Sequence, residues 1–174
     1  MQVLASMPIT VLTHEDIANL AVQSLLEEVR LTPKPGLVDK RGSGVHADLT
    51  LELMEQSAQS LRATFVCFAE AAAQHQWVNQ FLREELARIG RIGEHAMMKV
   101  THGVNTQRGA IWSVGLLIGS LSVRHKPANV LDLLGNAGAL ARMEDRFYQP
   151  KETSNGLQVK RVYGVEGARE QAEK

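Results

Sequence analysis

The amino-acid sequence predicts an all-α fold, a single-domain helical bundle of five to six helices over residues 1–174. Apolar residues recur at steps of three and four along five segments, which is the spacing of one helix face. Proline and glycine interrupt the chain between those segments. No stretch alternates apolar and polar residues as a half-buried strand would. A chain of 174 residues can form one hydrophobic core and is too short to argue for two.

The first helix is predicted to start at Thr13, a capping hydroxyl followed by two acidic residues. Pro33 ends this helix, because proline lacks an amide donor and keeps the residue before it out of the helical region. The predicted apolar face consists of Ile17, Leu20, Ala21, Leu25 and Val29.

A second helix is expected to begin near Asp48 or Thr50 and to continue to about Gln74. Its apolar residues follow helical spacing without an obvious break. The predicted core face consists of Leu51, Met54, Ala58, Leu61, Phe65 and Phe68.

A third helix is predicted over residues 82–97, loosened at Gly90 and Gly93. A fourth helix follows the turn THGVNTQRG. Within it Gly115 and Gly119 lie four residues apart, so a neighbouring helix can approach closely. The predicted core face of the fourth helix consists of Ile111, Val114, Leu117, Ile118 and Leu121.

A fifth helix fits Val130 to Arg146, residues 148–165 have the composition of a loop, and the last ten residues resemble the start of another helix. The single cysteine excludes an internal disulfide and fits a reducing cytoplasm. We expect Cys67 in the core, because it lies in the apolar run FVCFAEAAA.

Charge and hydropathy exclude two classes of partner. Nineteen basic residues balance nineteen acidic ones, so no overall field favours nucleic acid or a membrane surface. The apolar runs are far shorter than the roughly 20 residues that span a bilayer. The first residues lack the basic leader of a signal peptide.

Two polar segments rich in glycine are candidates for chemistry. In the first, LTPKPGLVDKRGSGVH, two prolines hold Lys34 on stiff backbone, and Gly36 permits a turn or close approach to a ligand. Lys34 and Arg41 suit a phosphate-bearing ligand, since arginine supplies a planar fork and lysine a point charge. The opposing interpretation is a helix-ending connector with solvated charges.

The same segment continues with three groups that can titrate or bind metal, Asp39, His46 and Asp48. They can act as a general base, orient one, or hold Mg²⁺, with Asp39 and Asp48 as the metal ligands.

The second segment, KVTHGVNTQRGAIW, places Thr101, Asn105, Thr106 and Arg108 ahead of a helix. Amides at a helix N-terminus together with an arginine suit a phosphate cradle. The segment matches neither a Walker A loop nor GxGxxG, and an ordinary capped helix start is the alternative. Because helix ends in a bundle can converge on one cleft, the two segments together favour an enzyme.

These residues also carry a resemblance to a known family. TPKPGLVD, the GxHxD pattern of Gly44, His46 and Asp48, GVNT before RGAI, and SNGLQVKRVYGVEGAREQAEK resemble the triphosphoribosyl-dephospho-CoA synthases. The resemblance covers nearly the whole chain. DKRGSGVHADLTLELM is closer to the malonate decarboxylase branch than to the citrate lyase branch.

The resemblance implies a glycosyl transfer between ATP and 3′-dephospho-CoA. The ribose 2′-hydroxyl of dephospho-CoA attacks C1 of the ATP ribose and adenine leaves, which gives the prosthetic-group precursor of an acyl carrier protein. The resemblance implies that Asp39 or Asp48, oriented by His46, accepts the hydroxyl proton or stabilises positive charge. It further implies that Lys34, Arg41 and Arg108 contact phosphates and that Asn105 and Thr106 contact a ribose or phosphate. A Mg²⁺ would bridge the triphosphate to a carboxylate.

The chain departs from the family pattern in two ways. Gln107 stands where family members often have histidine. Family members are also longer, and we therefore expect this chain to correspond to the N-terminal part of a longer family domain. Apolar surface left exposed would favour a homo-oligomer, a dimer. Two other functions stay open, a metal-dependent helical nucleotide hydrolase and a nucleotide-binding scaffold without turnover.

Overall fold

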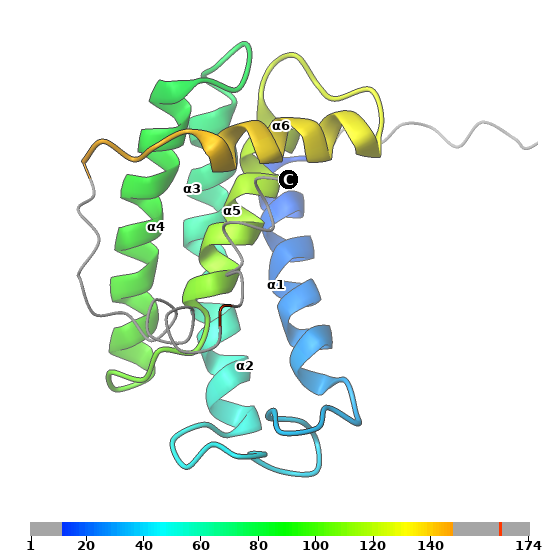
Figure 1. Ribbon diagram of the computed structural model, residues 1–174, viewed down its shortest axis with the longest axis vertical. Coiled ribbons are helices and arrows are strands. Elements are labelled where there is room, and N and C mark those ends of the chain that lie inside the picture. The colour runs from blue at the N-terminus through cyan, green and yellow to red at the C-terminus, as the bar shows by residue number, and fades with distance from the viewer. Residues whose placement is uncertain (1–11, 148–163, 165–174) are drawn as a thin grey trace, which may run out of the picture.

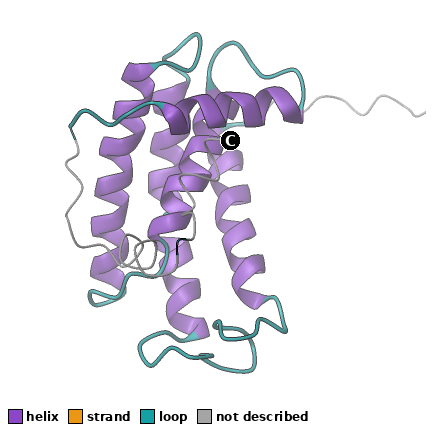
Figure 2. Ribbon diagram, viewed as in Figure 1, coloured by secondary structure: helices purple, strands orange, loops and turns teal. Residues whose placement is uncertain are grey.

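The computed structural model describes residues 12–147 and residue 164. Figure 2 shows helices joined by loops, and the described residues contain no β-strand, so the all-α prediction is confirmed. The expected helix start in the last ten residues, and all of the expected 148–165 loop except residue 164, lie outside the described residues. The helices are α1 (His14–Arg30), α2 (Leu51–Ser60), α3 (Arg62–Ala72), α4 (Gln80–Val100), α5 (Arg108–Ser122) and α6 (Val130–Arg142).

The helices alternate in direction, and this places the two polar segments at one end of the bundle. In Figure 1, α1 descends, α2 and α3 rise, α4 descends and α5 rises, while α6 crosses the opposite end. With α2 and α3 taken as one rising segment, the α1–α2 and α4–α5 connections fall at the same end of this up-and-down arrangement. The α1–α2 and α4–α5 connections are therefore neighbours at the end away from α6, and α3 packs centrally against α1, α4 and α5.

Helix α1 begins where the sequence predicts. The Asp16 amide donates to Thr13 Oγ1 at 3.1 Å and the Thr13 amide donates to the Asp16 carboxylate at 2.9 Å, which completes a capping box. The prediction that Leu20 faces the core is wrong, because Leu20 is exposed. The buried face of α1 centres on Ala18, Val22 and Val29, which lie on the opposite side of the helix from Leu20.

The expected continuous second helix is two helices, α2 and α3, that meet at Leu61. The Ser60 hydroxyl donates to the Ser57 carbonyl at 2.7 Å, and the Leu61 amide bonds to the carbonyl of Ala58, three residues back. Such local bonds compete with the regular helical ladder. Leu61 nevertheless remains fully buried, as predicted.

Two other side chains lie opposite their predicted positions. Cys67 is exposed, because it lies on the face of α3 turned away from the buried Phe65 and Phe68. Leu117 of α5 is also exposed, and its neighbour Leu116 is buried instead. Runs of consecutive apolar residues leave the helix phase ambiguous, and tertiary packing decides it.

The glycines of α4 and α5 serve close packing. Helix α4 is continuous through Gly90 and Gly93, so the predicted loosening is wrong. The close approach predicted at Gly115 and Gly119 is confirmed: a Cβ atom at Gly115 would lie 2.8 Å from a Phe68 ring carbon.

Helix α6 ends at Arg142, four residues before the predicted end. Met143 is extended, and the following residues cross α4, where the Gln80 side chain donates to the Glu144 carbonyl at 2.7 Å and Arg146 pairs with Glu84. None of the described helices combines the length and apolar character that a bilayer crossing requires.

Candidate functional site

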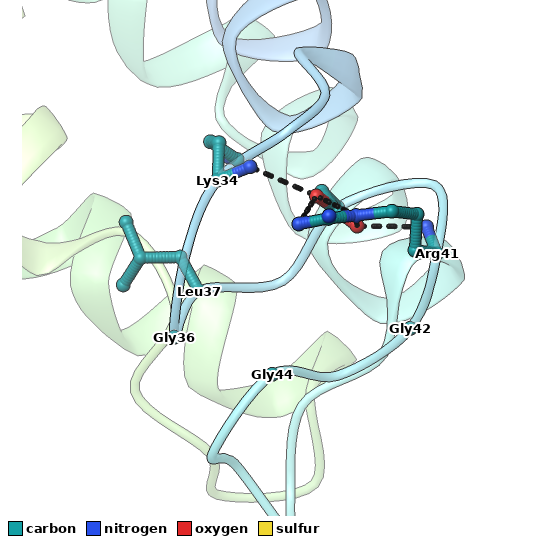
Figure 3. A pocket seen from close by; sticks show the side chains of 7 residues that line it. Lys34, Gly36, Leu37, Arg41, Gly42 and Gly44 are labelled. Atoms are coloured by element: carbon teal, nitrogen blue, oxygen red, sulfur yellow. Dashed lines mark hydrogen bonds and ion pairs between the residues drawn. The ribbon is translucent and has the colours of Figure 1, made fainter.

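The α1–α2 connection is a hairpin loop held by its own hydrogen bonds (Figure 3). Asp39 and Gly42 exchange two backbone hydrogen bonds of 3.0 and 3.1 Å across a tight turn. Farther from that turn, the Val45 amide donates to the Gly36 carbonyl at 3.2 Å. Gly44 adopts φ +60°, and a Cβ atom there would lie 2.6 Å from the Gly36 backbone, so this crossing requires glycine.

Asp39 organises this hairpin. Asp39 is 2% exposed, and its carboxylate accepts bonds from the Lys34 amide at 2.9 Å, the Arg41 amide at 2.7 Å and the Arg41 Nε at 2.9 Å. The bond from the Arg41 side chain, followed by that from the Lys34 amide, lowers the pKa of Asp39 from 3.8 to about 2. A carboxylate held this way is a weak base, and its lone pairs are engaged by the loop itself. Asp39 therefore positions the loop, and this geometry does not favour the expected base or metal ligand.

Lys34 and Arg41, the two cations of this hairpin predicted to bind phosphate, contact different partners. The Lys34 ammonium lies 3.0 Å from both the backbone carbonyl and the carboxylate of Glu28, at the C-terminal end of α1. Arg41 is 58% exposed, and Asp39 engages its Nε and Nη2. Guanidinium has five N–H donors, so Arg41 retains others for an incoming anion. Arg41 is the better placed phosphate ligand of the pair.

A shallow pocket of about 270 Å³ opens between the two sides of this hairpin loop (Figure 3). Its size is close to the lower end of the range for small-molecule sites. The lining residues are Lys34, Gly36, Leu37, Asp39, Arg41, Gly42 and Gly44.

His46 and Asp48 lie outside the lining of this pocket. His46 is partly buried and its amide donates to the Ser43 carbonyl at 3.1 Å, whereas Asp48 is exposed. No group of three His, Cys, Asp or Glu residues that could hold a metal ion occurs within the described part of the chain. The described residues therefore do not bring Asp39, His46 and Asp48 together as three metal ligands, and the catalytic and metal-binding roles expected of each stay predictions.

The α4–α5 connection is built on a buried hydroxyl. Thr101 is almost fully buried, and its Oγ1 donates to the Val104 carbonyl at 2.6 Å and lies 3.0 Å from the Met97 carbonyl. The Gly103 amide bonds to the Met98 carbonyl at 2.8 Å, which terminates α4. The structure thus gives Thr101 a structural role in place of the expected ligand contact.

The other predicted residues of this segment lie at the start of α5. Asn105 accepts a long bond of 3.3 Å from the Arg108 amide, and the Thr106 hydroxyl lies 2.5 Å from the Ser57 hydroxyl of α2. Arg108 is 57% exposed and its Nε donates to Glu94 at 2.6 Å. Arg108 and Arg41 are thus held in the same way, each oriented by a carboxylate with most of its side chain in solvent.

Sequence reasoning missed the residues that support the site. Ser57, Glu28 and Glu94 lie on helices outside the two polar segments, at separations of 49, 6 and 14 residues from their partners, and no motif marks them. Gln107 is buried, and its Nε2 has no hydrogen-bond partner among the residues described.

The arrangement can bind an extended anion. One exposed guanidinium belongs to Arg41 of the α1–α2 connection and the other to Arg108, the first residue of α5, at the same end of the bundle (Figure 1). The Ser57–Thr106 contact ties the α4–α5 connection to α2. Guanidinium recognises phosphate through paired N–H donors.

Comparison with known proteins agrees with this chemistry. A family model described as ATP:dephospho-CoA triphosphoribosyl transferase matches residues 14–174. Proteins named as probable 2-(5″-triphosphoribosyl)-3′-dephosphocoenzyme-A synthases are 50% identical over 159 residues in Stutzerimonas stutzeri, 51% over 159 in Pseudomonas syringae and 46% over 173 in Pseudomonas fluorescens. These matches cover 91%, 91% and 99% of the chain, and 54%, 54% and 59% of the relatives. The chain thus spans little more than half their length. No solved structure matches.

Proposed function

Since the chain belongs to the ATP:dephospho-CoA triphosphoribosyl transferase family, we propose that it takes part in transfer of the triphosphoribosyl group of ATP to 3′-dephospho-CoA. The 2′-hydroxyl oxygen of dephospho-CoA bonds to C1 of the ATP ribose, the bond from that carbon to adenine breaks, and the hydroxyl proton passes to a base. The observation that carries the proposal is the pair of carboxylate-oriented arginines, Arg41 and Arg108, at one end of the bundle.

The residues divide into positioning and binding roles. Asp39 and Glu94 orient the two arginines, and the arginines hold phosphates of the triphosphate or of dephospho-CoA. Thr106, held by Ser57, and Asn105 lie beside Arg108 and contact a ribose or phosphate. Exposed Asp48 accepts the hydroxyl proton, and His46, two residues away, orients it. Asp39 is excluded from that step by its four N–H contacts and low pKa.

Magnesium enters this scheme with the nucleotide. The described residues offer no group of three ligands for a resident ion, and the Asp39 oxygens are already engaged. The triphosphate itself supplies oxygen ligands that Mg²⁺ prefers. We assign no step of the reaction to a protein-bound metal.

Incubation with ATP and dephospho-CoA, with adenine followed by chromatography, tests the proposal. Adenine release that requires both substrates and falls at least about 100-fold in Asp48→Asn supports it, because loss of a general base costs about 10²–10⁴ in rate. Release of phosphate or AMP would indicate a hydrolase instead. Full activity in Asp48→Asn would remove that residue from the mechanism.

A second candidate function is a nucleotide-binding scaffold without turnover. It is favoured by the character of the described site, where the arginines Arg41 and Arg108 can bind an anion while the buried carboxylate of Asp39 is engaged by the loop itself. ATP binding without adenine release would indicate the scaffold. We further propose that the product serves the malonate decarboxylase carrier protein, that the chain acts in the cytoplasm, and that it forms a homodimer.

A further inference from the structure

The pocket of the α1–α2 hairpin has an apolar side that a bound phosphate alone would leave uncovered. Leu37 lines this pocket and is 53% exposed, whereas the next residue, Val38, is buried. In Figure 3 the Leu37 side chain lies on one side of the loop, and the Arg41 side chain reaches inward from the other side. Covering an exposed apolar side chain with an apolar part of a ligand is favourable in water. The pocket therefore offers an apolar contact beside a cationic one.

Much of the remaining pocket wall is backbone without side chains. Gly36, Gly42 and Gly44 line it, and a Cβ atom at Gly36 or Gly42 would meet nothing within 4 Å. Bare backbone of this kind lets a ligand approach closely. The volume of about 270 Å³ is just below the roughly 300–1,000 Å³ of sites that enclose a whole small molecule. The pocket is therefore suited to one ring system of a larger ligand.

The charged side chains of the pocket determine which group is attached to that ring. The Lys34 ammonium is engaged by Glu28, and the Asp39 carboxylate accepts N–H groups of the loop. The Arg41 side chain is 58% exposed and retains N–H donors. Among the residues that line the pocket, Arg41 is thus the charged group best placed to meet a ligand. A flat ring joined to an anionic group fits this combination, and a nucleotide has both.

We propose that this pocket is a subsite for an adenine base, in which Leu37 packs against the face of the base while Arg41 holds the phosphates of the same nucleotide. The inference rests on the proposed function, because both substrates of that reaction, ATP and dephospho-CoA, contain adenosine 5′-diphosphate. Leu37 is then a specificity-determining residue that favours adenosine nucleotides over free polyphosphate. Binding measurements with each substrate tell the two sources of adenine apart.

The methyl resonances of Leu37 test the proposal without reference to turnover. The ring current of an aromatic base shifts a methyl group packed on its face upfield, so ATP or dephospho-CoA should shift the Leu37 methyl signals upfield. Inorganic tripolyphosphate has no ring and should not do so. Leu31 is the matched control, because it is exposed in the same connection and does not line the pocket. Its methyl signals should stay in place with all three ligands, and the nucleotide that shifts Leu37 is the one whose base occupies the subsite.

Calorimetric affinities of the same nucleotide provide a second measurement. Leu37→Ser should weaken its binding about tenfold, because an apolar contact is lost. Leu37→Met keeps an apolar side chain and should largely restore the affinity, while Leu31→Ser should bind like the unaltered chain. Amide signals of Lys34 and Arg41, which donate to Asp39, should be unchanged in Leu37→Ser, since more than half of the Leu37 surface is in solvent.

Two outcomes would overturn the proposal, and both are separable from a failure of the proposed reaction. Leu37 methyl signals that stay in place with both nucleotides would mean that neither base enters the pocket, even in a chain that releases adenine. Equal affinities of Leu37→Ser and Leu31→Ser would mean that Leu37 makes no contact of its own. Upfield shifts of Leu37 in a chain that releases no adenine would instead support the subsite and reject the transfer.

Discussion

The two connections at the candidate-site end perform similar tasks with different chemistry. The α1–α2 hairpin is organised by a buried carboxylate, Asp39, that gathers amide and guanidinium N–H groups. The α4–α5 connection is organised by a buried neutral hydroxyl, that of Thr101, which donates to the Val104 carbonyl. An exposed arginine accompanies each, Arg41 within the hairpin and Arg108 directly after the α4–α5 connection. The comparison predicts that the hairpin depends on charge and the second connection does not.

The largest contrast is expected between Asp39→Ala and Thr101→Val. Asp39→Ala removes the acceptor for two backbone amides and releases Arg41, so we expect kcat/KM for adenine release to fall about 100-fold, a typical result of a displaced contact group. Thr101→Val keeps the shape and loses one neutral hydrogen bond, which should lower the free energy of unfolding by about 1 kcal/mol with activity within about threefold.

Lys40→Ala is the control for this pair, because Lys40 is an exposed cation of the same hairpin and makes no contact with Asp39 among the described bonds. It should retain nearly full activity. If Thr101→Val reduces activity as much as Asp39→Ala, the distinction between the two connections is wrong.

A second contrast comes from glycines with positive φ, Gly44 in the hairpin and Gly103 in the other connection. Alanine at either position costs roughly 1–2 kcal/mol for the left-handed backbone. At Gly44 the new methyl also meets the Gly36 backbone at 2.6 Å, whereas at Gly103 it meets nothing within 4 Å. Urea unfolding should therefore show a clearly larger loss for Gly44→Ala. Equal losses would mean that the hairpin opens easily and is not the rigid unit described above.

Sequence reasoning located both connections but not the way each is built. Helix starts at Thr13 and Thr50 follow from local capping chemistry, and the alternation of helices brings the two segments to one end. Two kinds of error remain. The phase of apolar runs decides whether Cys67 or Leu117 is buried, and only packing sets that phase. Polar residues such as Thr101 are predicted to contact a ligand, although their hydrogen-bond partners are backbone atoms a few residues away.

A smaller effect is expected from the contact between α2 and the α4–α5 connection. Ser57 is fully buried and its hydroxyl contacts Thr106. A double-mutant cycle with Ser57→Ala and Thr106→Val should give a coupling energy of about 1 kcal/mol, the net value of one hydrogen bond. Ser60→Ala, one turn further along α2, should show no coupling to Thr106→Val. Absence of coupling for Ser57 would mean that the α4–α5 connection is held by its own bonds alone.

The smallest effect expected near neutral pH is the dependence of hairpin stability on pH, which tests the charge of Asp39 alone. Because its pKa is lowered from 3.8 to about 2 in the folded hairpin, its stabilising effect is complete above pH 3.8 and is lost as pH falls through about 2. Amide signals of Lys34 and Arg41, which donate to Asp39, should therefore shift in this acid range. The amide of Gly103, which bonds to a carbonyl, should not follow that titration. In Asp39→Asn the acid transition at Lys34 and Arg41 should disappear, because the amide side chain does not titrate. A transition that persists in Asp39→Asn would arise from another carboxylate, and the hairpin would then owe its order to something other than Asp39.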